Sequence, residues 1–358
     1  MKDNYSAWQI DIGEFFKKRS KEEQAKFLLN FAVLAPSSHN SQPWNLKVTN
    51  DPFSDDIYYI HVRPDMSRFL GVSDITGREM FISLGCAVED MLVAADYYGI
   101  KTNVSYFSSS YNSAVTISLD FNSITTEHMP NKGDHLIFAI LKRRTNRNKY
   151  DSTIPLMGSW AINSLDRVKE LNVSCLFVSD NQKRSAITDV VMGAMDEAMS
   201  NRGFRRELSP YIKSNYTSSY LGMPGFGMGI PGPVSLFLPF LIKNFNMFKL
   251  SRKEDEALLK DHTKMFGIVA TKHDSPKHWL AAGQAYQCIA LEAVNSGLQT
   301  AVMAAAIEMG DHYKKLQEIL GISERPQVFF RIGLCEKEVH PSPRIKAEDL
   351  LARGGRRP

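Results

Sequence analysis

The feature that most constrains the fold is an internal repeat of one helix. Residues 82–102 align without gaps on residues 280–300, and in both segments apolar residues at helical spacing lead to a glycine suited to a helix end. The identical positions are mostly small residues: Gly85/Gly283, Ala87/Ala285, Ala95/Ala293, Gly99/Gly297 and Thr102/Thr300. Helices share small residues by chance, but the matching ends favour a duplicated chain.

Length and composition fit a chain made of two such units. The 358 residues suit two domains or one doubled unit, and 43% hydrophobic with 23% charged residues is typical of a folded, soluble protein. The N-terminal segment is polar without a signal-peptide core, and the four cysteines are far apart without metal-ligand spacing. We therefore expect a cytoplasmic protein with buried thiols and no metal.

The charge balance gives no general reason to expect a nucleic-acid partner. The net charge is +4, from 43 lysines and arginines against 39 acidic residues, and the cations gather only at 142–149 and in the C-terminal tail. The most apolar stretch, Val234–Phe248, is short for a membrane span and contains Pro239 and Lys243. A membrane partner is not expected, although a membrane-surface helix over this stretch is left open.

Local signals predict a mixture of helices and strands. Ser20-Lys21-Glu22-Glu23 has the form of a capping box and predicts a helix that ends before Pro36. Further helices are expected over 82–98 and after Asp134. Strand-like runs at 57–62, 115–121, 173–178 and 328–334 do not alternate regularly with helices, so we expect an α+β fold.

Two segments could carry chemistry, and each has a structural explanation as well. Arg143-Arg144-Thr145-Asn146-Arg147 follows a predicted helix, where cations are favoured by the helix dipole, but guanidinium groups this close also suit a phosphate. Pro36–Trp44 is dense in turn formers and could be a helix-terminating turn or a rigid loop that presents polar groups to a ligand. The residues alone leave both alternatives open.

These segments resemble the FMN-dependent nitroreductase family. Ala35–Trp44 is similar to the family's A-P-S-S-x-N-x-Q-P-W segment, and Arg143–Arg147 is similar to its R-R-S-x-R segment. The Gly85 and Gly283 helices resemble its central helix, and Ser342-Pro343-Arg344 resembles its phosphate-contacting segment near the C-terminus. In this order the matches cover most of the chain.

The order of the segments differs from that of an ordinary family member. There the arginine segment precedes the Pro-Ser-Ser loop, and each flavin site of a homodimer takes one part from each subunit; here the loop comes first. The resemblance is therefore to the tandem, Acg-like branch. It implies an intramolecular pseudo-dimer with halves at 1–130 and 131–358, one complete FMN site, a degenerate second site, and a lid insertion at about 201–260.

The resemblance also implies roles for individual residues. The expected FMN-binding residues are Pro36, Ser37, Ser38 and Asn40 at the ring, Arg143, Arg144, Thr145 and Arg344 at the phosphate, Arg147 toward the flavin N1 and C2 carbonyl, and the Ala304 backbone near N5. The acidic residue that the family often has near N5 is missing from 303–306. No catalytic residue is assigned.

The function implied is NAD(P)H-dependent reduction of a nitroaromatic or quinone-like acceptor by an FMN oxidoreductase. The alternative is a protein that stores or sequesters FMN beneath its lid with little or no reductase activity. A pseudo-dimeric monomer is expected, and a higher oligomer is left open.

Overall fold

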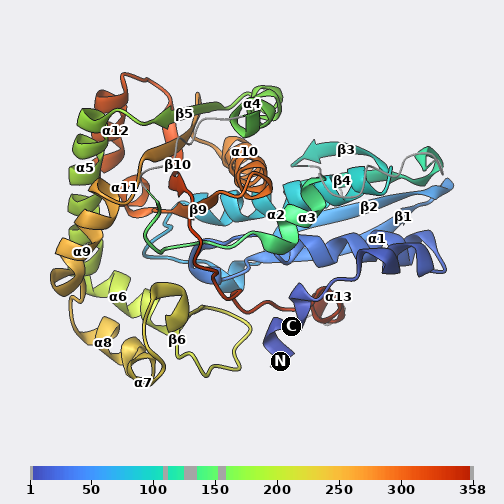
Figure 1. Cartoon of the computed structure of the whole chain (residues 1–358). Helices are drawn as coiled ribbons and strands as arrows, with labels where there is room; N and C mark the ends of the chain where they lie inside the picture. The colour runs from blue at the N-terminus through green and yellow to red at the C-terminus, as the bar shows by residue number, and fades with distance from the viewer. Residues whose placement is uncertain (1–2, 108–111, 125–134, 152–158, 355–358) are drawn as a thin grey trace.

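A computed structural model of the chain describes residues 3–107, 112–124, 135–151 and 159–354. Two four-stranded antiparallel sheets lie on either side of a central pair of helices (Figure 1). The central helices are α2 (Arg78–Tyr97) and α10 (Pro276–Asn295). The helix expected over 82–98 is α2, with Tyr98 as its C-cap, and Gly99 has the left-handed conformation typical of a helix end, with φ 72°.

The two sheets repeat one topology. The first has the order β1 (Trp44–Asp51), β2 (Ser54–Pro64), β4 (Val115–Asp120), β3 (Lys101–Tyr106). The second has the order β5 (Ser174–Val178), β8 (Met265–Thr271), β10 (Arg325–Gly333), β9 (Gln299–Val302). In each sheet a central helix joins the second strand to the third in chain order. The α+β fold and the internal pseudo-dimer expected from the sequence are therefore confirmed.

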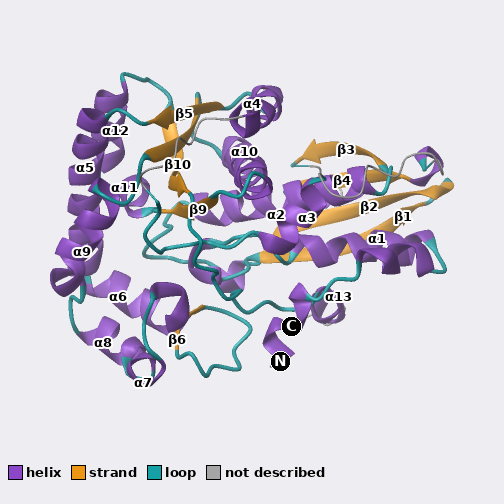
Figure 2. Cartoon of the chain, viewed as in Figure 1, coloured by secondary structure: helices purple, strands orange, loops and turns teal. Residues whose placement is uncertain are grey.

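The remaining helices surround these two units (Figure 2). In the first half, α1 (Lys21–Ala32) packs on the sheet beside α2, after the short 3₁₀ helices Asp3–Trp8 and Ile12–Lys17. In the second half, α4 (Ser159–Glu170) packs on α10, whereas α11 (Ala305–Glu308) and α12 (His312–Leu320) contact β10. The short helix α3 (Leu136–Lys142) packs against both central helices.

Of two predicted helix starts, the cap at Ser20 is confirmed, whereas the N-cap of α3 is a different residue from the one predicted. The Ser20 hydroxyl accepts a hydrogen bond from the Glu23 N–H at 3.2 Å, as a capping box requires, while the Glu23 carboxylate accepts from the Arg19 N–H at 2.8 Å. Asp134, expected to precede α3, lies outside the described residues. The N-cap of α3 is His135, whose ring accepts from the Ile137 N–H at 3.1 Å.

A long insertion separates β5 from β8, where the first half has only the tight turn between β1 and β2. It contains α5 (Asn181–Ser200), α6 (Arg202–Leu208), α7 (Gly232–Ser235), α8 (Leu238–Asn244) and α9 (Phe248–Lys260), with the short parallel pair β6 (Ile212–Lys213) and β7 (Met223–Pro224). The stretch 201–260, expected as a lid, lies within it. α5 and α9 pack together beyond the second sheet, and α6 to α8 extend below it (Figure 1).

The C-terminal segment crosses from the second half back to the first. After β10 the chain runs past the N-terminus, where the Trp8 indole N–H donates to the Ser342 carbonyl at 2.8 Å and the Arg344 N–H donates to the Asn4 carbonyl at 2.9 Å. Helix α13 (Ala347–Gly354) then packs on β1 and α1. The first half is thus completed by chain from the second.

Two glycines allow the central helices to cross in direct backbone contact. A Cβ atom on Gly85 would overlap the Leu280 carbonyl oxygen, and one on Gly283 would overlap the Ile82 carbonyl oxygen. The Cys86 thiol lies 3.3 Å from the Gly283 carbonyl oxygen, which shows how close the helices are. The repeated glycine marks the pseudo-twofold contact of the two halves.

Polar side chains beside this crossing are paired between the helices. The Gln287 amide donates to the Asp90 carboxyl at 2.7 Å, and the Gln284 amide donates to Glu89 at 3.1 Å. Asp90 is fully buried, and its second carboxyl oxygen has no hydrogen-bond partner among the described residues. Burial raises the pKa of Asp90 to about 8, so this carboxyl is largely protonated at neutral pH.

Among the described residues, no helix is both long and apolar enough to cross a membrane. All four cysteines are free thiols. Cys86 and Cys288 are buried, as expected, whereas Cys175 and Cys335 are only partly buried.

We predict that Gly85→Ala and Gly283→Ala each lower the free energy of unfolding by at least about 2 kcal/mol, because a methyl group forces the helix backbones apart. Gly227→Ala is the matched control, since no atom lies within 4 Å of its Cβ position. Denaturant titration measures all three. A loss of stability in the control as large as in the central glycines would contradict this account of the crossing.

We also predict that Asp90→Asn removes a pH dependence of stability. The pKa of Asp90 is raised above its unfolded value near 3.8, so the folded state retains a proton that the unfolded state loses. This residue therefore makes stability fall by about 1.4 kcal/mol per pH unit from about pH 4 to about pH 8. In denaturant titrations, the free energy of unfolding of the variant should rise relative to that of the wild type from about pH 5.5 to about pH 7.5. A difference in free energy of unfolding that does not change with pH would contradict the raised pKa of Asp90.

Candidate functional site

The site is built around the loop that follows α1. Its backbone is strained: His39, Asn40 and Gln42 have φ values of 53°, 54° and 52°, in the left-handed region that non-glycine residues seldom adopt. Two hydrogen bonds fix its shape. The Gln42 N–H donates to the Ser37 hydroxyl at 2.9 Å, and the Ser38 N–H donates to the Ser83 hydroxyl of α2 at 3.3 Å. Such strain persists only where the surrounding structure determines it, as at binding sites.

Asn40 ties the loop to two distant segments. Its amide donates to the Gly222 carbonyl of the insertion at 2.9 Å and to the Pro343 carbonyl of the C-terminal segment at 3.0 Å. Its carbonyl oxygen accepts from the Arg344 guanidinium at 2.5 Å. The Gln42 side-chain amide makes a similar pair of hydrogen bonds. Its N–H donates to the Tyr220 carbonyl, and its carbonyl oxygen accepts from the Ile345 N–H. The loop is therefore where the first half, the insertion and the C-terminal segment meet.

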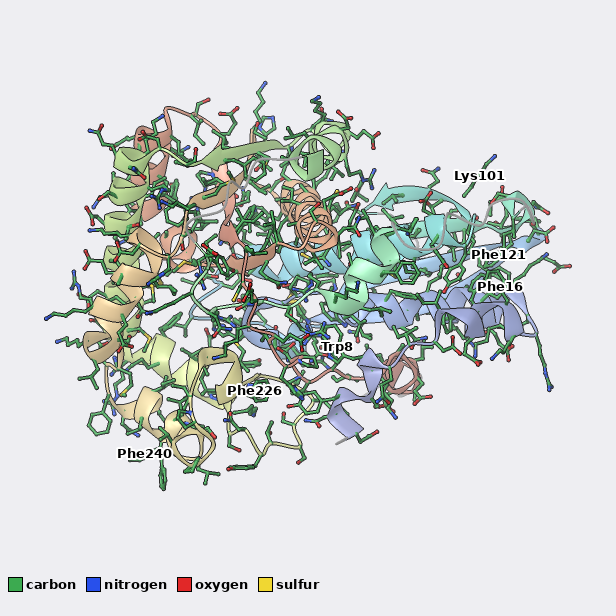
Figure 3. The ribbon with its side chains drawn as sticks, in the orientation of Figure 1. Trp8, Phe16, Lys101, Phe121, Phe226 and Phe240 are labelled. Carbon is green, nitrogen blue, oxygen red and sulfur yellow. The ribbon has the colours of Figure 1, made fainter. Side chains whose placement is uncertain are left out.

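Two adjoining cavities open beside the loop. The larger one has a volume of about 250 Å³ and lies between the loop, α2, Tyr286 of α10 and the start of α11. The smaller one, of about 30 Å³, lies between the arginine segment, the C-terminal segment and Trp8. Figure 3 shows Trp8 near the middle of the molecule, below the central helices. Thr145, Arg147 and Met223 line both cavities, so the two adjoin each other.

The smaller cavity is strongly electropositive. Arg143, Arg144, Arg147 and Arg344 line it, and no aspartate or glutamate does. Arg143 and Arg344 are only 2% and 3% exposed. Burial, together with the charges of Arg143 and Arg144, holds the pKa of Arg344 well below its usual range. Like charges buried together are costly unless an anion neutralises them, so this cavity is suited to a phosphate or similar group.

Unsatisfied donors support an anion at this place. Arg143 Nη1 and Arg344 Nε are buried and have no hydrogen-bond partner among the described residues. The other donors of Arg344 are used by the Leu34 and Ala35 carbonyls, Pro343 and Asn40, which fix its guanidinium. The Arg144 guanidinium stacks on Trp8 with 3.9 Å to the ring centroid. Burial and the neighbouring Arg143 lower the pKa of Arg144 to about 10, so it stays charged at neutral pH.

The larger cavity is mostly apolar, with an acidic group in one wall. Glu79 of α2 and Glu308 of α11 both line it. Arg78 pairs with Glu79 at 2.5 Å and donates to the Gln327 carbonyl at 2.5 Å. Burial, and then the charge of Glu79, raises the pKa of Glu308 well above its usual range, which favours the protonated form of this carboxyl. Among the described residues, no group of side chains is arranged to bind a metal ion.

His39 adds a neutral ring to the same cavity. Burial lowers its pKa to about 4, so the imidazole is uncharged at neutral pH. Its Nε2 atom is buried without a hydrogen-bond partner among the described residues. The ring lies in edge contact with Phe204 of α6, which places the insertion against the loop.

The structure brings nine of the ten predicted site residues to these cavities. Pro36, Ser37, Ser38 and Ala304 line the larger one, Arg143, Arg144 and Arg344 the smaller one, and Thr145 and Arg147 both. Asn40 lines neither, because its side chain is used to tether the loop. The role of each residue toward a ligand stays a prediction.

Several lining residues were missed from the sequence: Glu79, Glu308, Tyr286, Phe204 and Met223. The acidic residue that we found missing from 303–306 has a counterpart close by, since Glu308 lies one helical turn after Ala304. Its spacing from Ala304 was a usable signal. The other four come together only through tertiary folding.

Comparison with known proteins gives relatives along most of the chain, although no family model matches it. "Putative NAD(P)H nitroreductase Rv3131" of Mycobacterium tuberculosis is 27% identical over 330 residues, which are 92% of this chain and 90% of the relative. "Putative NAD(P)H nitroreductase acg" of the same organism is 23% identical over 325 residues, 89% of this chain and 91% of the relative. The chain resembles the Acg-like nitroreductases along nearly its whole length. The resemblance stated from the motifs is thus confirmed.

Solved structures give a weaker likeness. An FMN- and NADPH-dependent nitroreductase, NfnB from a Sphigopyxis strain, aligns with a TM-score of 0.41 and 14% identity over 60% of this chain and 96% of its own. A nitroreductase A from Vibrio parahaemolyticus aligns with a TM-score of 0.37 over 60% of this chain and 73% of its own, at 13% identity. Scores this low do not by themselves establish a common fold.

Proposed function

We propose that this Acg-like chain is an FMN-dependent oxidoreductase that uses NAD(P)H to reduce a nitroaromatic or quinone-like acceptor. The observation that carries the proposal is that a mostly apolar cavity adjoins a cavity lined by arginines. FMN has the matching shape, because a flat ring system is joined through a short polar chain to a phosphate. The names of the related nitroreductases support the same reaction class.

The residues present fit FMN. The guanidinium groups of Arg143, Arg144 and Arg344 would hold the phosphate, with the two buried unsatisfied donors as its partners. Pro36, Ser37, Ser38 and Ala304 would bound the ring, and Arg147, which lines both cavities, would lie toward its N1 side. When bound, FMN supplies two-electron chemistry between a nicotinamide and an acceptor.

The side chains around the larger cavity would prepare it for this chemistry. Phe204, Leu208 and Met223 of the insertion cover it and exclude water. Arg147 keeps a positive charge where the reduced ring carries negative charge. Glu308 lines the same cavity with a raised pKa, and in its protonated form it would be a proton donor to an acceptor that gains electrons there.

The organisation of the chain belongs to the same proposal. We propose halves at 1–130 and 131–358, with one FMN site between them and a degenerate second one. The free thiols support a reducing compartment, and we propose a cytoplasmic protein. The physiological acceptor is proposed only as a small aromatic molecule, and no nucleic acid takes part.

The second candidate function is the storage of FMN. It is favoured by the insertion, which lines the larger cavity and is fixed to the loop through Asn40 and Gly222. A lid held in this way would keep reductant and acceptor from a bound flavin.

We predict that anaerobic NADH or NADPH bleaches the flavin absorbance of the purified protein, since the proposed reaction requires the nicotinamide to reach the flavin ring. Re-oxidation by an added quinone or nitroaromatic completes the test. A yellow protein that neither cofactor bleaches would favour storage. A protein that binds no added FMN would contradict both candidate functions.

We predict that Arg147→Gln weakens FMN binding at least about tenfold, because it removes a charge-assisted contact, with little change in stability. Arg19→Gln is the matched control, since Arg19 is exposed at the start of α1. Flavin fluorescence titration measures the affinity, and thermal unfolding without FMN measures stability. Equal affinities in the two variants would contradict the placement of Arg147 at the flavin.

A further inference from the structure

The insertion presents an apolar outer face that the rest of the chain leaves uncovered. Phe237 and Phe240 are 66% and 62% exposed, and Leu250, at the start of α9, is 78% exposed. Leu236 and Phe245 are also more than half exposed. Figure 3 shows Phe240 directed away from the body of the protein at its lower edge. We call these five residues the outer face.

The outer face is the solvent side of an otherwise packed helix. On α8 the buried residues are Leu238 and Ile242, one turn apart, and they join a small core with Ile212. Phe240 falls on the opposite side of α8, and Phe237, its N-cap residue, lies three residues before Phe240. A helix that buries one apolar side and exposes another has more apolar surface than its own fold uses, which is the usual sign of a binding surface.

The segment that carries this face contains only positive charges, and acidic residues begin at Glu254, one turn after Leu250 on α9. Residues 208–253 contain no aspartate or glutamate, whereas Lys213, Lys243, Lys249, Arg252 and Lys253 lie within them. Lys243 and Lys249 are exposed beside the outer face, and neither forms an ion pair with a carboxylate of the described residues. Arg252 is the exception, since it lies 3.7 Å from Asp196. None of the 39 acidic residues of the chain lies in residues 208–253.

We propose that the outer face binds the surface of an anionic lipid bilayer. Exposed phenylalanine and leucine side chains enter the boundary between headgroups and acyl chains, and lysines beside them attract anionic headgroups. The bilayer is favoured over a protein partner because aromatic residues and unpaired cations share one short, outward-facing segment. The absence of a spanning helix among the described residues is consistent with binding at the surface only.

This face lies close to the proposed flavin site. The core beneath α8 includes Leu208 and Met223, and both also line the larger cavity. One layer of side chains therefore separates the bilayer-facing helix from the cavity. The proposal itself does not rest on the flavin function, because the face and its charge are independent of any ligand in the cavity.

Co-sedimentation of the full chain with lipid vesicles tests the proposal. We expect binding to vesicles of phosphatidylcholine with phosphatidylglycerol, much weaker binding to phosphatidylcholine alone, and release by salt. A wild-type protein that stays in the supernatant with both kinds of vesicle overturns the proposal.

Matched variants distinguish binding through the outer face from nonspecific adsorption to vesicles. Phe237→Ser with Phe240→Ser, and separately Lys243→Glu with Lys249→Glu, should each lower the partition coefficient at least about tenfold. Phe53→Ser and Lys101→Glu are the controls. Phe53 is 95% exposed on the β1–β2 turn, and Lys101 begins β3 in the first half, away from the insertion (Figure 3). An equal loss in the controls would overturn the proposal, as would unchanged binding in the outer-face variants.

A second copy of the chain is the rival occupant of this face. Sedimentation velocity of the same variants without lipid decides between the two. A wild-type species whose mass does not change in the phenylalanine variant supports the bilayer. A wild-type dimer that the same variant dissociates overturns the proposal in favour of self-association.

Discussion

The close crossing of α2 and α10 is the contact on which the rest of the structure depends. Gly85 and Gly283 bring the backbones of the two helices together, and each is fixed to its own sheet. This contact places Ser83 of the first half and Tyr286 of the second on one cavity, with the strained loop resting on α2. A duplicated chain therefore behaves as one unit, because the site exists only where the two copies touch.

Electrostatics and chain connectivity then decide where a ligand can bind. The arginine segment follows α3, the Pro-Ser-Ser loop follows α1, and Arg344 arrives from a C-terminal segment that crosses between the halves. These cations have no carboxylate among the residues that line their cavity, and two of their donors are buried unsatisfied. Glu308 lines the larger cavity, and burial raises its pKa well above the usual range. A cavity lined by arginines suits the phosphate of a cofactor such as FMN, and the mostly apolar cavity next to it suits the cofactor's flat ring.

The sequence predicted the features that depend on local chemistry. The Ser20 cap, the Gly99 helix end and the repeated central helix all have short-range signals, and the structure confirms them. Strand β8 gave no alternating pattern because helices cover both faces of its sheet and every residue in it is buried. Asn40 is predicted to contact the flavin, and the structure adds that its amide donates to Gly222 and Pro343, contacts that join residues far apart in the chain. Burial, and then proximity to Glu79 of the other half, raises the pKa of Glu308, which no local pattern records. The motifs thus predicted which segments meet. The contacts that each side chain makes within those segments depend on tertiary packing.

The stoichiometry of bound FMN tests the account most directly. The flavin released on denaturation would be compared with protein concentration after saturation with FMN, and sedimentation velocity would give the mass of the species that holds it. One FMN for each chain in a monomer is expected, since the loop of one half and the arginines of the other form a single complete site. Two FMN molecules for each chain, or binding only by a dimer, would contradict the claim that one chain completes one site by itself.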